Sequence, residues 1–268
     1  MQSRNIFGKF RNKQKDILMP KSIVENIDCV EGMKQFPDKF FDLAIVDPPY
    51  GIGVSKMAYL QENKTTVKQK NGTRLKPRKT LYKKSDWDLE IPKEEYFNEL
   101  FRVSKNQIIW GINYFSITNI GNGLIKWNKC IPDGLSFKKY EYAYCSLIDF
   151  EKEFTYLCSG FNIGINLDYP TTAQKNMKLV EQRIHPTQKP IMLYNWLLEN
   201  YAKQGDKILD THLGSQSSRI AAYKKGFDFW GFEIDKDYFD QGNERFEKSI
   251  AMPLFDSIRP QMQQLSLV

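Results

Sequence analysis

Short apolar segments alternate with amphipathic segments along most of this chain. Phe41–Val46 and Phe229–Glu233 have the composition of buried strands, whereas Glu94–Val103 and Ile191–Tyr201 have helical spacing. Strands separated by helices predict an α/β fold with a largely parallel sheet, because parallel neighbours need a long crossover connection. The same patterns predict further strands and one more helix, at Gln107–Trp110, Leu124–Trp127, Tyr140–Ser146, Lys207–Leu209 and, for the helix, Ser217–Lys225.

Composition narrows the class of protein. A chain of 268 residues with 41% hydrophobic residues can bury the core of one large domain. Its 39 Lys and Arg against 32 Asp and Glu favour a polyanionic partner. We expect a cytoplasmic protein without a membrane segment, because no apolar run approaches the roughly 20 residues of a spanning helix and the N-terminus lacks a signal-peptide pattern. The four cysteines and two histidines show no metal-ligand spacing, so we predict reduced thiols and no metal.

The most informative motif is Asp47-Pro48-Pro49-Tyr50, directly after the strand Phe41–Val46. Two successive prolines fix the backbone in an extended geometry that orients the preceding carboxylate and carbonyls. Such a corner can offer two acceptors to an amino group while Tyr50 stacks on the ring that carries it, as the exocyclic amine of a nucleobase requires. The structural alternative is a Pro-Pro turn with an incidental Asp and Tyr.

A basic segment, residues 54–86, interrupts the α/β pattern. It contains ten Lys and Arg against Glu62 and Asp86. Its position after the Asp-Pro-Pro-Tyr motif favours DNA contact over a merely solvated loop, because phosphate neutralisation beside a catalytic pocket supplies affinity there. The predicted DNA-binding residues are Lys56, Lys68, Lys70, Arg74, Lys76, Arg78 and Lys79.

A second motif reads as strand, Gly/Ser loop and helix over Lys207–Ala222. The sequence Trp230-Gly231-Phe232-Glu233 then ends the next strand with an acid. This arrangement is typical of a nucleoside-containing cofactor, whose ribose hydroxyls a strand-end carboxylate can bind. An NAD-type site and a ligand-free turn are the alternatives, and the low glycine content disfavours NAD. Between the two motifs lies His185-Pro186-Thr187-Gln188-Lys189-Pro190, which by itself predicts only a loop and a helix start.

Together, in this order, these motifs resemble those of the S-adenosylmethionine-dependent DNA amino-methyltransferases, in the permuted group whose catalytic motif precedes the cofactor motif. The resemblance also includes Val24–Met33, Ile108–Phe115 and Ile125–Lys129, and so covers most of the chain outside residues 54–86 and 147–182. It implies a Rossmann-like fold, with a seven-stranded, mainly parallel sheet and helices on both faces, in a single domain over residues 1–268. Residues 147–182 are expected to form a short target-recognition segment.

The resemblance also implies roles for individual residues. It implies methyl transfer to the N6 amine of adenine in double-stranded DNA, because Asp rather than Ser begins the catalytic motif, with N4 of cytosine as the alternative. The target base must be flipped out of the duplex to reach the site. The implied catalytic residues are Asp47, Pro48, Pro49 and Tyr50. The implied cofactor-binding residues are Asp28, Thr187, Lys189, Asp210, Gly214, Ser215 and Glu233, with Asp28 and Glu233 at the adenosine end.

The chain departs from the family pattern in the cofactor loop, where Thr211, His212 and Gln216 replace a Pro, a Phe and a Gly. A glycine permits close approach or unusual φ, so the side chain of Gln216 is expected to intrude on the cofactor. Two hypotheses follow: an active enzyme with weaker cofactor affinity, or a DNA-binding pseudoenzyme. Three other functions are compatible with parts of this pattern: methylation of RNA, methylation of a protein or small molecule, and DNA binding without catalysis. The short recognition segment suggests either a short target site or help from a second subunit in a homodimer.

Overall fold

The computed structural model describes most of the chain. The described residues are 19–53, 88–118, 120–131, 138–156, 181 and 183–251, with the backbone of four two-residue strands, β3 (Val67–Lys68), β4 (Arg74–Leu75), β9 (Cys158–Ser159) and β10 (Asn162–Ile163). In the described part no helix is both long enough and apolar enough to cross a membrane.

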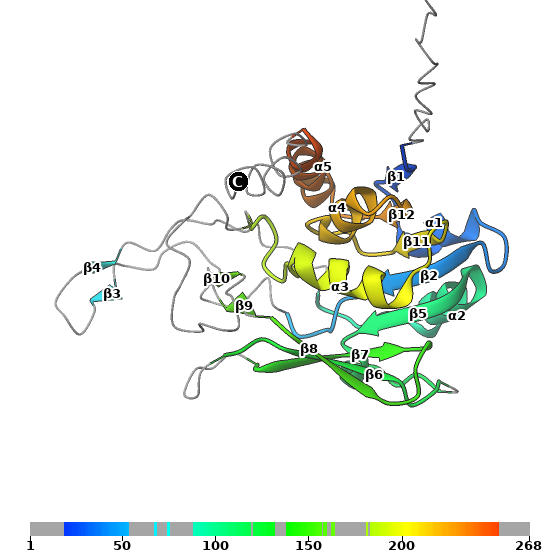
Figure 1. Cartoon of the computed structure of the whole chain (residues 1–268), viewed down its shortest axis with the longest axis horizontal. Coiled ribbons are helices and arrows are strands. Elements are labelled where there is room, and N and C mark those ends of the chain that lie inside the picture. Colours follow the sequence, from blue (N-terminus) through cyan, green and yellow to red (C-terminus); the bar gives the residue numbers. More distant parts are fainter. Residues whose placement is uncertain are drawn as a thin grey trace, which may run out of the picture.

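The centre of the fold is an eight-stranded sheet in the order β1-β12-β11-β2-β5-β7-β6-β8 (Figure 1). Its strands are β1 (Ser22–Glu25), β2 (Phe41–Val46), β5 (Ser104–Trp110), β6 (Leu124–Asn128), β7 (Tyr140–Cys145), β8 (Glu151–Thr155), β11 (Lys207–Asp210) and β12 (Asp228–Phe232). Only β7 runs against the others, pairing antiparallel with β5 and β6. The α/β prediction is confirmed, but the predicted count of seven strands is wrong.

Two strands, β1 and β8, lie outside the predicted strand ranges, and β8 pairs in parallel with β6 at the edge of the sheet. Its sequence, Glu-Lys-Glu-Phe-Thr, is mostly polar, because an edge strand exposes much of its surface and needs few apolar residues. It lies within residues 147–182, so at least this part of the predicted recognition segment belongs to the central sheet. Residues 164–180 of that segment lie outside the described residues.

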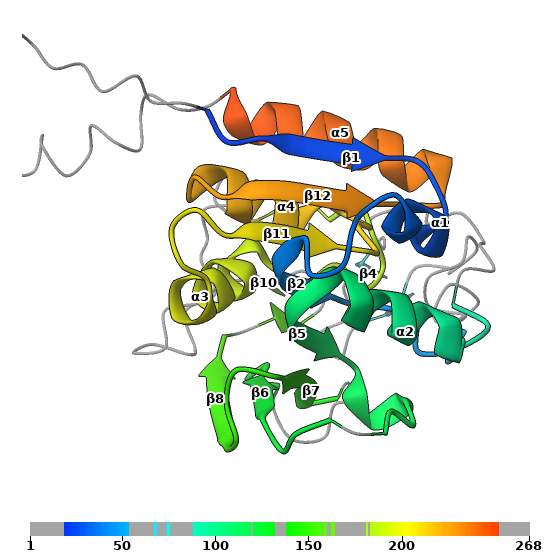
Figure 2. The ribbon, with the colours of Figure 1, turned by 90° about the vertical axis from the view of Figure 1, so that its right-hand side faces the viewer.

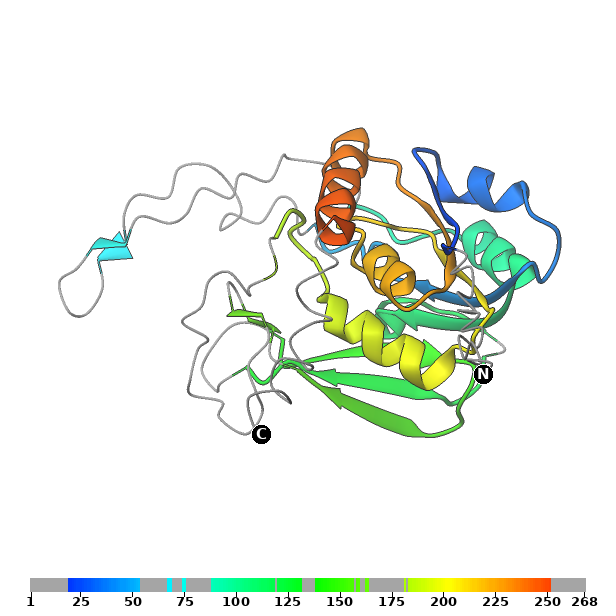
Figure 3. The same cartoon turned by 45° about the horizontal axis from the view of Figure 1, so that its top comes forward.

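Helices cover both faces of the sheet (Figure 3). On one face, α3 (Ile191–Tyr201) and α4 (Ser217–Lys224) pack on a cluster that includes Leu43 and Ile45. On the other face, α1 (Cys29–Lys34) and α2 (Glu94–Val103) pack on Ala44 and Val46. Alternate residues of β2 therefore face opposite layers, as the two-residue period of a strand requires. The last helix, α5 (Lys236–Ile250), packs against α4.

Candidate active site

The predicted site residues follow the carboxyl ends of neighbouring parallel strands (Figure 2). Asp28 follows β1, Glu233 follows β12, Gly214 follows β11 and Asp47 follows β2, and these four strands are neighbours in the order β1-β12-β11-β2. Because the ends of parallel strands meet at one edge of the sheet, residues up to 205 positions apart share that edge. This edge is where open α/β sheets bind their ligands.

The Asp47 carboxylate is held by two side chains. The Tyr50 hydroxyl donates to Asp47 Oδ1 at 2.5 Å, and Lys189 Nζ pairs with Asp47 Oδ2 at 2.6 Å. The same ammonium lies 3.3 Å from Glu141 Oε2, on the antiparallel strand β7. Residues from β7, from the segment before α3 and from the end of β2 therefore form one cluster. We call it the catalytic corner, after the predicted catalytic residues Asp47 and Tyr50, and define it as Asp47, Tyr50, Glu141 and Lys189.

Burial and pairing shift the pKa values in this corner. Burial alone would lower the pKa of Lys189, but the carboxylates of Asp47 and Glu141 outweigh that effect and raise it. Burial raises the pKa of Asp47, an effect that Lys189 opposes. Burial would also raise the pKa of Glu141, yet Lys189 and Lys129 lower it to about 2. The lysine therefore stays protonated at neutral pH and the glutamate stays ionised.

Tyr50 is fixed by backbone and ring contacts as well. Asp88 Oδ1 accepts hydrogen bonds from the backbone N–H groups of Tyr50 and Gly51, at 2.8 and 3.1 Å. The Tyr50 ring stacks on Tyr114, with centroids 4.7 Å apart and an interplanar angle of 10°. Gly111 (φ +73°) lies so close that an added Cβ would be 2.1 Å from Tyr50 Cε1, so a glycine is required there.

The predicted cofactor loop, residues 211–216 between β11 and α4, is hydrogen-bonded to two acids. Asp210 is 1% exposed and accepts hydrogen bonds from the His212 amide and the Ser218 hydroxyl, so it lies beneath the loop and supports it. Burial raises its pKa to about 7. Glu233 accepts hydrogen bonds from the backbone of Gly214 at 2.7 Å and of Asp235 at 2.9 Å. A carboxylate oxygen has a further lone pair, so Glu233 can still accept from a ligand hydroxyl.

Gln216 does have the backbone conformation expected of a glycine, with φ 59° and ψ 28°. Its side chain, however, is fully buried between α4 and α5, where Nε2 donates to the Phe239 carbonyl and to Asn243 Oδ1, and Oε1 accepts from Arg219. Space for it exists because residue 242 is glycine: a Cβ there would lie 2.6 Å from Gln216 Nε2. The side chain thus packs into the helix interface, which removes the reason to expect a clash with the cofactor.

Thr211 and His212 belong to a polar chain at this part of the loop. Thr211 Oγ1 lies 2.7 Å from the Tyr96 hydroxyl and 2.9 Å from His212 Nδ1, and His212 Nε2 lies 3.8 Å from Cys29 Sγ. Burial lowers the pKa of His212 to about 4, so the ring is neutral at pH 7. These side chains tie the loop to α1 and α2 through hydrogen bonds and through an edge contact between the rings of His212 and Tyr96.

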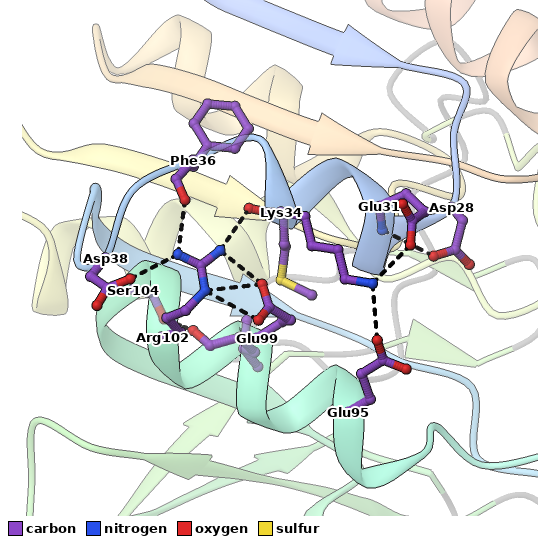
Figure 4. A network of polar contacts seen from close by, with 11 residues as sticks. Asp28, Glu31, Lys34, Phe36, Asp38, Glu95, Glu99, Arg102 and Ser104 are labelled. Carbon is purple, nitrogen blue, oxygen red and sulfur yellow. Dashed lines mark hydrogen bonds and ion pairs between the residues drawn. The ribbon is translucent and has the colours of Figure 1, made fainter.

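Asp28 caps α1, accepting hydrogen bonds from the amides of Val30 and Glu31. Helix α1 is attached to α2 by a network of polar contacts (Figure 4). Arg102 donates to the carbonyls of Met33 and Phe36 and pairs with acids on both sides, and Lys34 bridges two glutamates. The capping of α1 and this network fix the position of Asp28 at the sheet edge.

The remaining predicted site residues lie nearby or outside the described part. Thr187 Oγ1 lies 3.1 Å from His185 Nδ1, and the Ser215 hydroxyl lies 3.1 Å from that of Ser217. Lys189 was predicted to bind the cofactor, whereas in the structure its ammonium forms ion pairs with Asp47 and Glu141. Among the predicted DNA-binding residues, Lys68 and Arg74 are paired in the β3–β4 ladder, and their side chains lie outside the described residues, as do Lys56, Lys70, Lys76, Arg78 and Lys79.

Sequence reasoning missed Glu141 and assigned no role to Tyr114. The available signal for Glu141 was a single acid in an aromatic strand, Tyr140-Glu141-Tyr142, a place where a charge needs a partner. No local pattern names that partner, because Lys189 is 48 residues away. Within the described residues, no group of three or more His, Cys, Asp or Glu could hold a metal.

The site suits S-adenosylmethionine in its chemistry. An exposed apolar side chain, Ile234, follows the Glu233 carboxylate, which fits a flat adenine joined to a ribose. The hydroxyls of Thr187 and Ser215 can provide polar partners for an amino acid end. Most amides of the loop, those of His212, Leu213, Gly214 and Gln216, already donate within the protein. The catalytic corner adds a carboxylate and an aromatic ring on the next strand end.

Comparison with known proteins supports this interpretation. The family model described as DNA methylase, of the N6/N4 type, matches residues 109–244. The chain is 23% identical to the Type II methyltransferase M.HpaI of Haemophilus parainfluenzae over 88% of this chain and 77% of the relative, and 23% identical to YubD of Escherichia coli (strain K12) over 81% and 87%.

Among solved structures, the PvuII DNA methyltransferase, titled cytosine-N4-specific, has a TM-score of 0.47 and 14% identity, covering 87% of this chain and 92% of that one. The family match spans half of the chain and includes Glu141, Lys189 and the cofactor loop. The chain therefore belongs to the N6/N4 DNA methyltransferases, which use S-adenosylmethionine to methylate an exocyclic amine of DNA.

Proposed function

We propose that this enzyme methylates the N6 amine of adenine in double-stranded DNA, at a flipped-out base. The observation that carries the proposal is the Asp47 carboxylate at the end of β2, fixed by Tyr50 and Lys189. The Asp that begins the catalytic motif, where the resemblance associates Ser with cytosine, supports adenine. N4 of cytosine is the second candidate.

The chain's own residues activate the amine. An amine conjugated to a base is a poor nucleophile because its lone pair is delocalised into the ring. Asp47 and the Pro48 carbonyl would each accept one N–H, which pulls the nitrogen toward tetrahedral geometry and localises the lone pair. Both oxygens of Asp47 are already hydrogen-bonded, so the amine must displace Tyr50 or share an oxygen with Lys189. Asp47 or solvent takes the released proton.

We place the cofactor at the same edge of the sheet as Asp47. S-adenosylmethionine supplies a methyl group activated by a sulfonium. Asp28 and Glu233 would hold its adenosine, and Thr187, Gly214 and Ser215 its amino acid end. Placement of the two reactants at adjacent strand ends converts a bimolecular step into one that depends on orientation.

The recognition of DNA is part of the proposal. The basic segment 54–86, with its seven named Lys and Arg, would contact phosphates, and the part of residues 147–182 beyond β8 would contribute to target recognition. We treat residues 1–268 as one methyltransferase domain and a homodimer as its assembly on DNA. A gel-filtration mass of one chain, with and without DNA, would contradict the homodimer.

The test is to incubate the protein with tritiated S-adenosylmethionine and unmethylated genomic DNA, then digest the DNA and identify the labelled nucleoside. Label in N6-methyladenine supports the proposal. Label in N4-methylcytosine retains the family and overturns the base assignment. In a parallel incubation with RNA in place of DNA, label in the RNA but none in the DNA would overturn the substrate assignment. Binding of DNA without any label would identify a pseudoenzyme.

A further inference from the structure

Four charged side chains form a row that ends at the catalytic carboxylate. Lys129 Nζ lies 2.6 Å from Glu141 Oε1, Glu141 Oε2 lies 3.3 Å from Lys189 Nζ, and Lys189 lies 2.6 Å from Asp47 Oδ2. All four are largely shielded from solvent, with side-chain exposures of 13, 24, 4 and 17% in that order. Positive and negative charges alternate along the row, and the formal charges cancel.

The amine chemistry of Asp47 does not require Glu141. A single lysine would already pair with Asp47, and a further buried acid costs desolvation. Glu141 is nevertheless ionised, because Lys189 and Lys129 lower its pKa to about 2. Its position therefore has an electrostatic consequence. Lys129 and Lys189 with Asp47 alone would carry one excess positive charge, which Glu141 cancels, so that the row beside the substrates is neutral.

That balance matters for a cationic methyl donor. Reacting atoms in a transfer step must approach to about 3–3.5 Å. The amine nitrogen is proposed to contact Asp47, so the sulfonium must lie within a few ångströms of the Asp47–Lys189 pair. In a site shielded from water, an uncompensated ammonium at that range repels a sulfonium strongly.

We propose that Glu141 is a positioning residue that acts through Lys189: it offsets the lysine charge so that the site accepts the cationic sulfonium of S-adenosylmethionine beside the target amine. The inference rests on the proposed function of this site. It predicts that Glu141 favours binding of the cationic cofactor over binding of its neutral product, S-adenosylhomocysteine. The two ligands differ by one methyl group and one charge.

The experiment is calorimetric titration of the full chain with each of the two ligands. Glu141→Gln should weaken binding of S-adenosylmethionine about tenfold and that of S-adenosylhomocysteine by less than about twofold. Lys129→Gln removes a cation from the other end of the row and should shift the ratio of the two dissociation constants in the opposite direction. Glu153→Gln is the matched control, since it removes an acid from the 39% exposed bridge to Lys126 and should leave the ratio unchanged.

The outcomes separate charge from structure. Equal weakening of both ligands in Glu141→Gln would overturn the inference, because a merely structural residue disturbs both alike. If Glu141→Gln fails to fold, the direction of the ratio in Lys129→Gln decides, and an unchanged ratio there also overturns it. If the wild type labels DNA but neither variant changes the ratio of the two dissociation constants, only this inference is wrong. A wild-type chain that binds neither ligand and labels no DNA sinks the proposed function itself.

Discussion

The catalytic corner and the cofactor loop lie at neighbouring strand ends but are stabilised in different ways. The corner depends on ion pairs between distant segments, with Lys189 between Asp47 and Glu141. The loop depends on hydrogen bonds from its backbone amides to Asp210 and Glu233 and on volume, as at Gln216, whose side chain fills space left by Gly242. The difference teaches that charge changes should dominate the effect of substitutions in the corner, and size changes those in the loop.

Removal of the corner's central carboxylate is expected to have the largest effect. Asp47→Ala should lower the rate of methyl transfer by about 10²–10³ or more, because an acceptor aimed at the reacting amine is lost. DNA binding, measured by filter retention, should persist. Glu244→Ala, which removes a 66% exposed acid on α5, is the control and should leave the rate unchanged. Turnover that survives Asp47→Ala would contradict the mechanism.

Loss of the corner's cation should mainly affect stability. Lys189→Met leaves Asp47 and Glu141 buried without their shared counter-charge, which should lower the free energy of unfolding by about 3–5 kcal/mol. Lys105→Met removes a lysine that pairs with Asp42 at 2.6 Å but is 53% exposed, and should change stability little. Urea denaturation of both variants tests the contrast, and equal losses would remove the distinction between buried and exposed pairs.

His185 connects the two regions, because its ring lies beside Gly214 and it precedes Lys189 by four residues. Burial, with a smaller contribution from Lys189, lowers its pKa from 6.5 to about 3. The unfolded chain therefore binds a proton that the folded chain does not, and stability is lost as pH falls below 6.5. Between pH 8 and pH 5 the wild type should lose about 2 kcal/mol relative to His185→Gln. Urea unfolding of both proteins at the two pH values measures this difference. A constant difference would show that the ring is not buried as a neutral group.

The smallest expected effect is a loss of stability caused by a change of side-chain volume beside the loop. Gly242→Ala should cost about 1 kcal/mol or more, because the new Cβ collides with Gln216. In a Gln216→Gly background the same substitution should cost nothing. Thermal denaturation of the four proteins of this double-mutant cycle measures the coupling. Additive costs would mean that the two side chains do not share space. In a separate calorimetric titration, Gln216→Gly should leave cofactor affinity unchanged.

Much of the fold could be predicted because it depends on local patterns. The apolar run of β2 and the helical spacing of α2 and α3 match the structure residue for residue. β8 was missed because an edge strand needs few apolar residues. The short α1 and the polar α5 were missed although Asp28 and Asp235 cap their first turns, because α1 has only six residues and α5 has few apolar residues.

The sequence by itself determined the α/β class, the tetrapeptide predicted to be catalytic and the order of the motifs, since each of these can be read from the linear sequence. Tertiary structure alone decided that Lys189 lies on Asp47, that Glu141 joins them and that Gln216 turns into the helix interface. Those facts depend on which segments the sheet order brings together, and on space that a distant glycine leaves open. Ion pairs and packing act through space, so a linear pattern contains no record of them.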